Sequence, residues 1–198
     1  MFIIRQSQNQ FLIQDLAKQP KARISLGAFE KESLLEPKAD MVLVARDKGF
    51  PLNWEKLKDK PFLINSPGEY EGKGVGIQAI PYNGKLIYLV RFGQEKLAYF
   101  PHPSQKELTP QQMDQITEAD FLLISLDGQG LGPDKTAALI SQLEPPVVIP
   151  MDYEPHHLQR LAEVLGGGKI EEETSLVTSK LSLIPEGTTL VHALSISL

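Results

Sequence analysis

The sequence contains no cysteine, a single tryptophan and no excess of positive charge. Without cysteine, the chain has no disulfide, no thiolate zinc site and no cysteine nucleophile, as is usual for cytoplasmic proteins. A net charge of −5 argues against nucleic-acid binding, because that function requires a basic surface that neutralises phosphates. No segment approaches the roughly 18 consecutive apolar residues that a membrane span needs, and the short apolar stretch within residues 1–5 is too short for a signal peptide. We therefore expect a cytoplasmic protein that binds neither nucleic acid nor a membrane.

The composition is that of a folded globular protein. Of the 198 residues, 41% are hydrophobic and 23% are charged, so the chain has enough apolar side chains to bury a core. The length suits one ordinary domain, and no stretch resembles a linker or a low-complexity segment. We predict a single domain over residues 1–198.

Short apolar strands separated by turns dominate the first half of the chain. The run Met41-Val42-Leu43-Val44-Ala45 is continuous and rich in β-branched residues, which is typical of a strand that is buried on both faces. A turn is expected at Ser66-Pro67-Gly68. The predicted strands are 2–4, 11–14, 23–26, 41–45, 62–64, 75–80, 85–92 and 96–100.

Helices alternate with strands in the second half. Thr109, Pro110 and Gln112 form the pattern of a capping box with proline at the first helical position, and they predict a helix to about residue 116. Two more helices are expected from about 133 and over 155–165, and the first of these would direct Ala137, Ile140 and Ser141 inward. Strands are predicted at 121–126, 147–150, 181–184 and 189–198. The overall pattern is one of mixed α and β structure.

Three stretches, taken in order, resemble one branch of the metallo-β-lactamase superfamily, the Zn-dependent hydrolases of the β-lactamase fold. They are FLINSPGEYE at 62–71, ADFLLISLDG at 119–128 and AALISQLEPPVVIPMDY at 137–153. The resemblance covers nearly the whole chain. It implies an α/β (α+β) fold, namely an αββα sandwich of two mixed β-sheets with helices outside and an active site at one edge.

The resemblance also implies a metal site, but its ligands are missing from this sequence. Family members place an H-x-H-x-D-H motif directly after a buried strand, and its metal ions lower the pKa of a bound water and polarise the bond under attack. In this chain Arg46, Lys48, Phe50 and Pro51 stand at the four ligand positions. Two of these residues are cations and two have no donor atom. We predict that this motif binds no metal.

The remaining ligand positions of the family have changed as well. The strand that would precede the bridging aspartate runs into Pro101-His102-Pro103, and the IPMHY motif that carries the last histidine reads IPMDY, with Asp152 in its place. Gln8 stands at the histidine of an early G-H-S motif. The loss therefore extends to the whole ligand set.

A different metal site is one alternative for the residues that remain. If the fold is correct, Asp47, His102, Asp152, His156 and His157 lie on loops at one edge, where carboxylates and imidazoles could together hold zinc or manganese. If these residues do not bind a metal, they are ordinary polar residues of surface loops.

An anion site is a second alternative. Arg46 and Lys48 bring positive charge to the position of the lost metals, and this charge could hold a phosphate or a carboxylate. We favour an internal ion pair of one of them with Asp152 or Asp47, because an unpaired charge in a half-buried cleft is costly.

The sequence thus favours a protein that has lost the chemistry of its fold. We expect a non-catalytic pseudo-hydrolase with a binding or regulatory role, without catalytic residues and without a bound cofactor. The alternatives are a divergent metal-dependent hydrolase with a rebuilt site and a scaffold subunit of an oligomer, including a homo-oligomer. The sequence identifies neither a ligand nor a partner.

Overall fold

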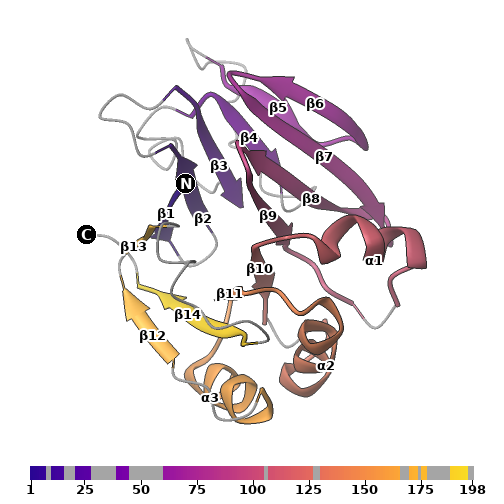
Figure 1. Ribbon diagram of the computed structural model, residues 1–198, viewed down its shortest axis with the longest axis vertical. Helices are drawn as coiled ribbons and strands as arrows, with labels where there is room; N and C mark the ends of the chain where they lie inside the picture. Colours follow the sequence, from indigo (N-terminus) through magenta and orange to yellow (C-terminus); the bar gives the residue numbers. More distant parts are fainter. Residues whose placement is uncertain are drawn as a thin grey trace.

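Two β-sheets lie face to face in the computed structural model (Figure 1). It describes residues 1–7, 10–15, 21–27, 39–44, 60–104, 107–126, 130–165, 170–173, 175–177 and 188–195. The smaller sheet has six strands in the order β13-β1-β2-β3-β4-β5. Its strands β3, β4 and β5 are parallel to one another, and the others pair antiparallel. The bounds are β1 (Phe2–Ser7), β2 (Gln10–Gln14), β3 (Arg23–Gly27), β4 (Met41–Val44), β5 (Phe62–Ile64) and β13 (Ser175–Val177).

The larger sheet has eight strands in the order β12-β14-β11-β10-β9-β8-β7-β6. The part from β6 to β9 is an antiparallel meander, and β9, β10, β11, β14 and β12 run parallel. Both sheets are therefore mixed, as the resemblance implied. The bounds are β6 (Gly68–Gly72), β7 (Val75–Tyr82), β8 (Lys85–Phe92), β9 (Glu95–Phe100), β10 (Phe121–Ser125), β11 (Val147–Met151), β12 (Ile170–Glu173) and β14 (Leu190–Leu194).

The main core fills the space between the sheets. Alternate residues along each strand point into it, as in β7, where Val75, Ile77 and Ala79 are buried and Gly76 and Gln78 are half-buried. Burying a side chain such as Leu or Ile contributes about 1.5–3 kcal/mol. The opposite face of the six-stranded sheet is covered too, because Leu12 and Val42 on that face are also buried.

Three helices cover the outer face of the eight-stranded sheet (Figure 1). They are α1 (Pro110–Thr117), α2 (Pro133–Leu143) and α3 (Pro155–Val164). The predicted capping box of α1 is confirmed, since Thr109 Oγ1 accepts from the backbone N–H of Gln112 and the Gln112 side chain accepts from the backbone N–H of Thr109. In α2, Ala137 and Ile140 face the sheet as predicted. Ser141 is exposed, so its predicted inward position is wrong.

The fold agrees with the expected sandwich of two mixed sheets, with differences in a few strands. Residues 68–72 form strand β6 where a turn was expected at Gly68, because pairing with β7 satisfies their backbone groups. The short strands β12 and β13 were not predicted. The predicted strand 181–184 lies outside the described residues.

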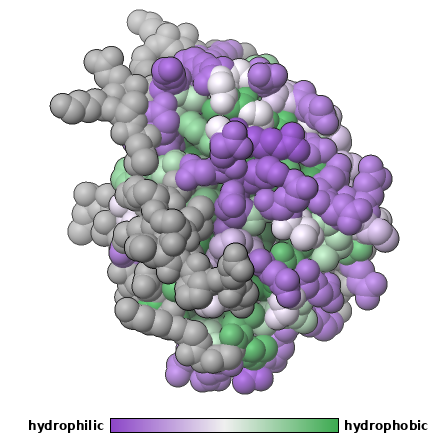
Figure 2. All heavy atoms as spheres, viewed as in Figure 1, coloured by the Kyte–Doolittle hydropathy of each residue, from purple (hydrophilic) through white to green (hydrophobic). Residues whose placement is uncertain are grey.

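Hydrophilic residues predominate in the described part of the face shown in Figure 2, with smaller hydrophobic areas between them. In the part of the chain that the structure describes, no helix is both long enough and apolar enough to cross a bilayer.

Candidate functional site

The parallel strands of the two sheets end at the same edge of the sandwich. Tyr88 in β8 connects the ends of β4 and β5, because its hydroxyl lies 3.0 Å from the carbonyl oxygens of Val44 and Ile64. Tyr88 also pairs with Tyr99, next to the end of β9, and the two rings stack with their centroids 6.0 Å apart. The carboxyl ends of β4, β5 and β9 therefore meet at this edge, which is where α/β sheets commonly place binding sites.

Asp152 lies directly after β11 at this edge. Its Oδ2 accepts a hydrogen bond of 3.2 Å from the hydroxyl of Ser125, the last residue of the neighbouring strand β10. The backbone of Asp152 has a φ of 53°, a left-handed conformation that Asp tolerates better than most residues. The conformation and the hydrogen bond together hold the carboxylate beside the end of β10.

Arg5 brings a buried positive charge to the same edge. Arg5 is only 7% exposed. Its Nη1 donates a hydrogen bond of 2.7 Å to the carbonyl oxygen of Leu194, the last residue of β14. The same nitrogen lies 3.2 Å from the hydroxyl of Tyr153, and the guanidinium carbon is 5.3 Å from the centre of that ring. A guanidinium over an aromatic face gains up to about 2 kcal/mol when it is desolvated.

Of the three histidines of the predicted rebuilt site, the structure brings two, His156 and His157, into contact with each other. His102 lies two residues after the end of β9, and it is half-buried. His156 and His157 lie in the first turn of α3 with ring centroids 4.1 Å apart, and the buried Nδ1 of His157 has no hydrogen-bond partner in the described part of the chain. Among the residues that the structure describes, no three His, Asp or Glu side chains are grouped closely enough to hold a metal ion.

The described residues do not fit the metal centre that the fold implies. A divalent metal needs several uncharged or negative donors around it, usually four for zinc. This edge instead contains the guanidinium of Arg5, a permanent cation at neutral pH, bonded to Tyr153 and to the Leu194 carbonyl. Asp152, where the resemblance implies the family's last histidine, accepts a hydrogen bond from Ser125.

Other predicted site residues lie outside the described part of the structure. These are Arg46, Asp47 and Lys48, together with Phe50 and Pro51 at the remaining positions of the motif that the resemblance implies. The anion site, the internal ion pair of Arg46 or Lys48, and a metal site that includes Asp47 therefore stay predictions.

Arg5 and Tyr88 were not among the sequence candidates. The alternation of β1 offered a signal for Arg5, because Ile3 faces the core and the residue two positions later points the same way. A charged residue at an inward position needs polar partners. For Tyr88 the signal was weaker, since alternation predicts an inward tyrosine but not the carbonyl groups that its hydroxyl reaches.

Solved structures share this fold over nearly the full chain. The chain is similar to a protein from Thermotoga maritima that is described as a putative Zn-dependent hydrolase of the metallo-β-lactamase superfamily. The two sequences are 20% identical, and the structures align with a TM-score of 0.73 over 98% of this chain and 100% of that one. It is also similar to the metallo-β-lactamase fold protein YhfI from Bacillus subtilis, with 8% identity, a TM-score of 0.63, and coverage of 100% and 97%. A metallo hydrolase from Ignicoccus hospitalis matches with 13% identity, a TM-score of 0.57, and coverage of 82% and 90%.

At these identities the likenesses show the fold and not the activity. No curated protein matches the sequence. A family model described as the beta-lactamase superfamily domain matches residues 8–152, which is well over half of the chain. The chain therefore belongs to the beta-lactamase superfamily.

Proposed function

We propose that this chain is a non-catalytic member of its superfamily, whose remaining role is binding or regulation. The observation that supports this most directly is the buried guanidinium of Arg5 at the edge where the strands end. Hydrolysis on this fold depends on metal ions that supply a hydroxide and polarise the substrate. A fixed cation at this edge opposes the binding of a divalent ion.

The sequence that follows β4 supports the same proposal. Arg46 and Lys48 add two more positive charges, and Phe50 and Pro51 contribute no donor atom, at the four positions where the family motif has its ligands. Coulomb repulsion between a divalent ion and these cations adds to the loss of ligands. Each change alone would weaken metal binding, and together they leave this motif with no residue that can coordinate a metal ion.

The direct test is the metal content of the purified protein. After incubation with zinc and, separately, with manganese followed by removal of free metal, we expect far less than one equivalent of either by mass spectrometry. We also expect the same melting temperature with and without a chelator, because a metal that bound only the native state would raise stability by RT ln(1 + L/Kd), where L is the free metal concentration, and its removal would lower the melting temperature.

The rival hydrolase hypothesis makes the opposite prediction. Near-stoichiometric metal and a clear stabilisation would overturn our proposal if His102→Ala or Asp152→Ala abolished both. Asp114→Ala is the matched control, because Asp114 is exposed on α1, outside the candidate site. Binding that this control abolished as well would not be specific to the candidate site.

A further inference from the structure

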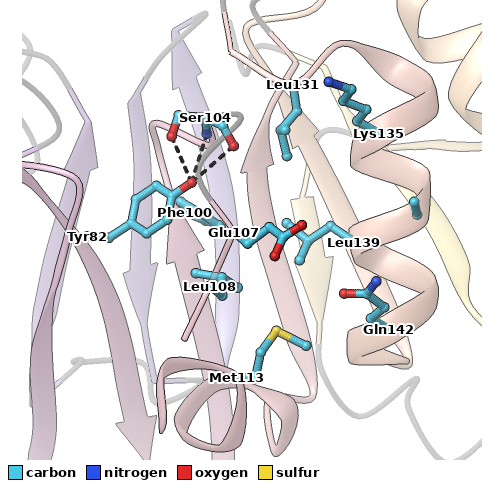
Figure 3. Close-up of a pocket in the computed structure, with 11 residues that line it drawn as sticks. Tyr82, Phe100, Ser104, Glu107, Leu108, Met113, Leu131, Lys135, Leu139 and Gln142 are labelled. Atoms are coloured by element: carbon cyan, nitrogen blue, oxygen red, sulfur yellow. Dashed lines mark hydrogen bonds between the residues drawn. The ribbon is translucent and has the colours of Figure 1, made fainter. Parts of the chain in front are cut away.

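A cavity of about 400 Å³ lies between α1 and α2, on the helix-covered side of the eight-stranded sheet (Figure 3). This volume is within the range of small-molecule sites, about 300–1,000 Å³. Neither Arg5 nor Asp152 lines it, so it is distinct from the candidate site described above. Its walls come from the ends of β7 and β9, from the segment before α1, and from the two helices.

Two aromatic rings form one wall of the cavity. Tyr82 and Phe100 are buried and meet edge to face, with ring centroids 4.9 Å apart at 90°. The hydroxyl of Tyr82 lies 2.9 Å from Ser104 Oγ and accepts from the Ser104 backbone N–H at 3.1 Å (Figure 3). This contact fixes the chain after β9, so the wall is preformed.

Four further apolar side chains around the cavity are only half-buried. They come from different parts of the chain and converge on the same space, and they are Leu108, Met113, Leu131 and Leu139. Apolar surface gains about 25 cal/mol for each Å² removed from water. An apolar molecule in the cavity would therefore complete the burial of these side chains.

The rim of the cavity is polar and carries both signs of charge. Lys135 and Gln142 are exposed on α2, seven residues apart and thus on one face of the helix. Glu107 is exposed on the segment before α1, and among the described residues no ion pair engages its carboxylate. A bound molecule would meet a cation and an amide from one helix and an anion from the opposite wall.

We propose that this cavity binds a small molecule with an apolar body and a zwitterionic head, the chemistry of a free apolar amino acid. The body fills the space beside Tyr82 and Phe100. The carboxylate of the head faces Lys135, and its ammonium faces Glu107. Exposed ion pairs are weak, so the body supplies most of the affinity and the head sets the orientation. The proposal does not depend on the loss of metal binding.

The methionines of the chain provide a direct readout. Met113 lines the cavity, whereas Met1, Met41 and Met151 are buried in the core between the sheets and serve as internal references. In protein labelled with ¹³C at the methionine methyl groups, L-phenylalanine should shift the Met113 signal saturably and leave the other three unchanged. The matched probes 3-phenylpropionate and 2-phenylethylamine each lack one charge, and each should bind about two- to fivefold more weakly.

Variants that fill the cavity test its location. Leu139→Trp enlarges a half-buried side chain that borders the space, and it should abolish the response of Met113 to L-phenylalanine without lowering the melting temperature. Ser141→Trp is the control, because Ser141 is exposed on the same helix and does not line the cavity. Leu131→Trp fills the space from another wall and replaces Leu139→Trp if that variant does not fold.

Three results would overturn the proposal. The first is no Met113 shift with L-phenylalanine at millimolar concentration. The second is an undiminished shift in a folded cavity-filling variant. The third is equal or tighter binding of either single-charge probe, which would refute the zwitterionic head.

Discussion

Replacing Tyr88 by Phe tests how the candidate site is held together. Tyr88 is fully buried, and its hydroxyl reaches the carbonyl oxygens of Val44 and Ile64, both at 3.0 Å. The substitution removes only the hydroxyl, so it leaves almost no cavity. The substitution does deprive the carbonyl oxygens of Val44 and Ile64 of their hydroxyl donor, which should lower the free energy of unfolding by about 1–3 kcal/mol.

The loss of this hydrogen bonding should lower the overall stability and should also loosen the ends of β4 and β5. For a chain of this size, about 3 °C of melting temperature corresponds to 1 kcal/mol, so we expect Tyr88→Phe to lower it by about 3–9 °C. Hydrogen exchange should also accelerate in β4 and β5, whose ends the hydroxyl connects.

Tyr82→Phe is the control for this experiment. It removes a hydroxyl of the same kind from the other side of the eight-stranded sheet, where it contacts Ser104. Its effect on hydrogen exchange should be absent from β4 and β5. If Tyr88→Phe changes the melting temperature by less than about 1 °C, the hydroxyl does not stabilise this edge and our account of it is refuted.

Two further predictions concern the outer layer. Thr109→Ala removes the side-chain cap of α1 and should cost about 0.5–2 kcal/mol in chemical denaturation, and an effect near zero would show that the capping box does not stabilise this helix. Glu118 receives a side-chain hydrogen bond from Lys96, whose positive charge also helps to hold the pKa of this carboxyl below its ordinary value. A lowered pKa stabilises the folded state above the ordinary Glu pKa of about 4.3, and that stabilisation is lost as the pH falls through the lowered value. Wild type should therefore melt slightly above Glu118→Gln at pH 7 and equal it near pH 2, and a difference that does not depend on pH would contradict this cause.

Local rules predicted most of the elements in the second half of the chain. The start of α1 follows from Thr109, Pro110 and Gln112 alone, because a capping box satisfies its hydrogen bonds within four residues. Strands β10 and β11 follow from continuous apolar runs, and all of their residues are buried. Strand β6 could not be derived in this way, because its residues are exposed or half-buried and only pairing with β7 makes them a strand.

The sequence resemblance indicated where Asp152 and His102 lie but not what they contact. It placed both residues on loops at one edge, and in the structure they follow β11 and β9, the two strands that flank β10. The contact between Arg5 and Leu194 joins residues 189 positions apart, so no local pattern could indicate it. The left-handed backbone of Asp152 is likewise a product of the tertiary arrangement.

The core of the fold consists of two extensive apolar clusters, one between the sheets and one under the helices. Neither cluster includes Arg5 or Asp152, which lie at the edge where the strands end. At that edge the Leu194 carbonyl and the Tyr153 ring already have a cation beside them in Arg5.

A metal that bound at this edge, at a free concentration of a hundred times its dissociation constant, would add about 2.7 kcal/mol of stability. At roughly 3 °C for each kcal/mol, that is about 8 °C of melting temperature. Melting with zinc is therefore more decisive than an activity assay, because it needs no knowledge of a substrate and a missing shift cannot result from choosing the wrong one.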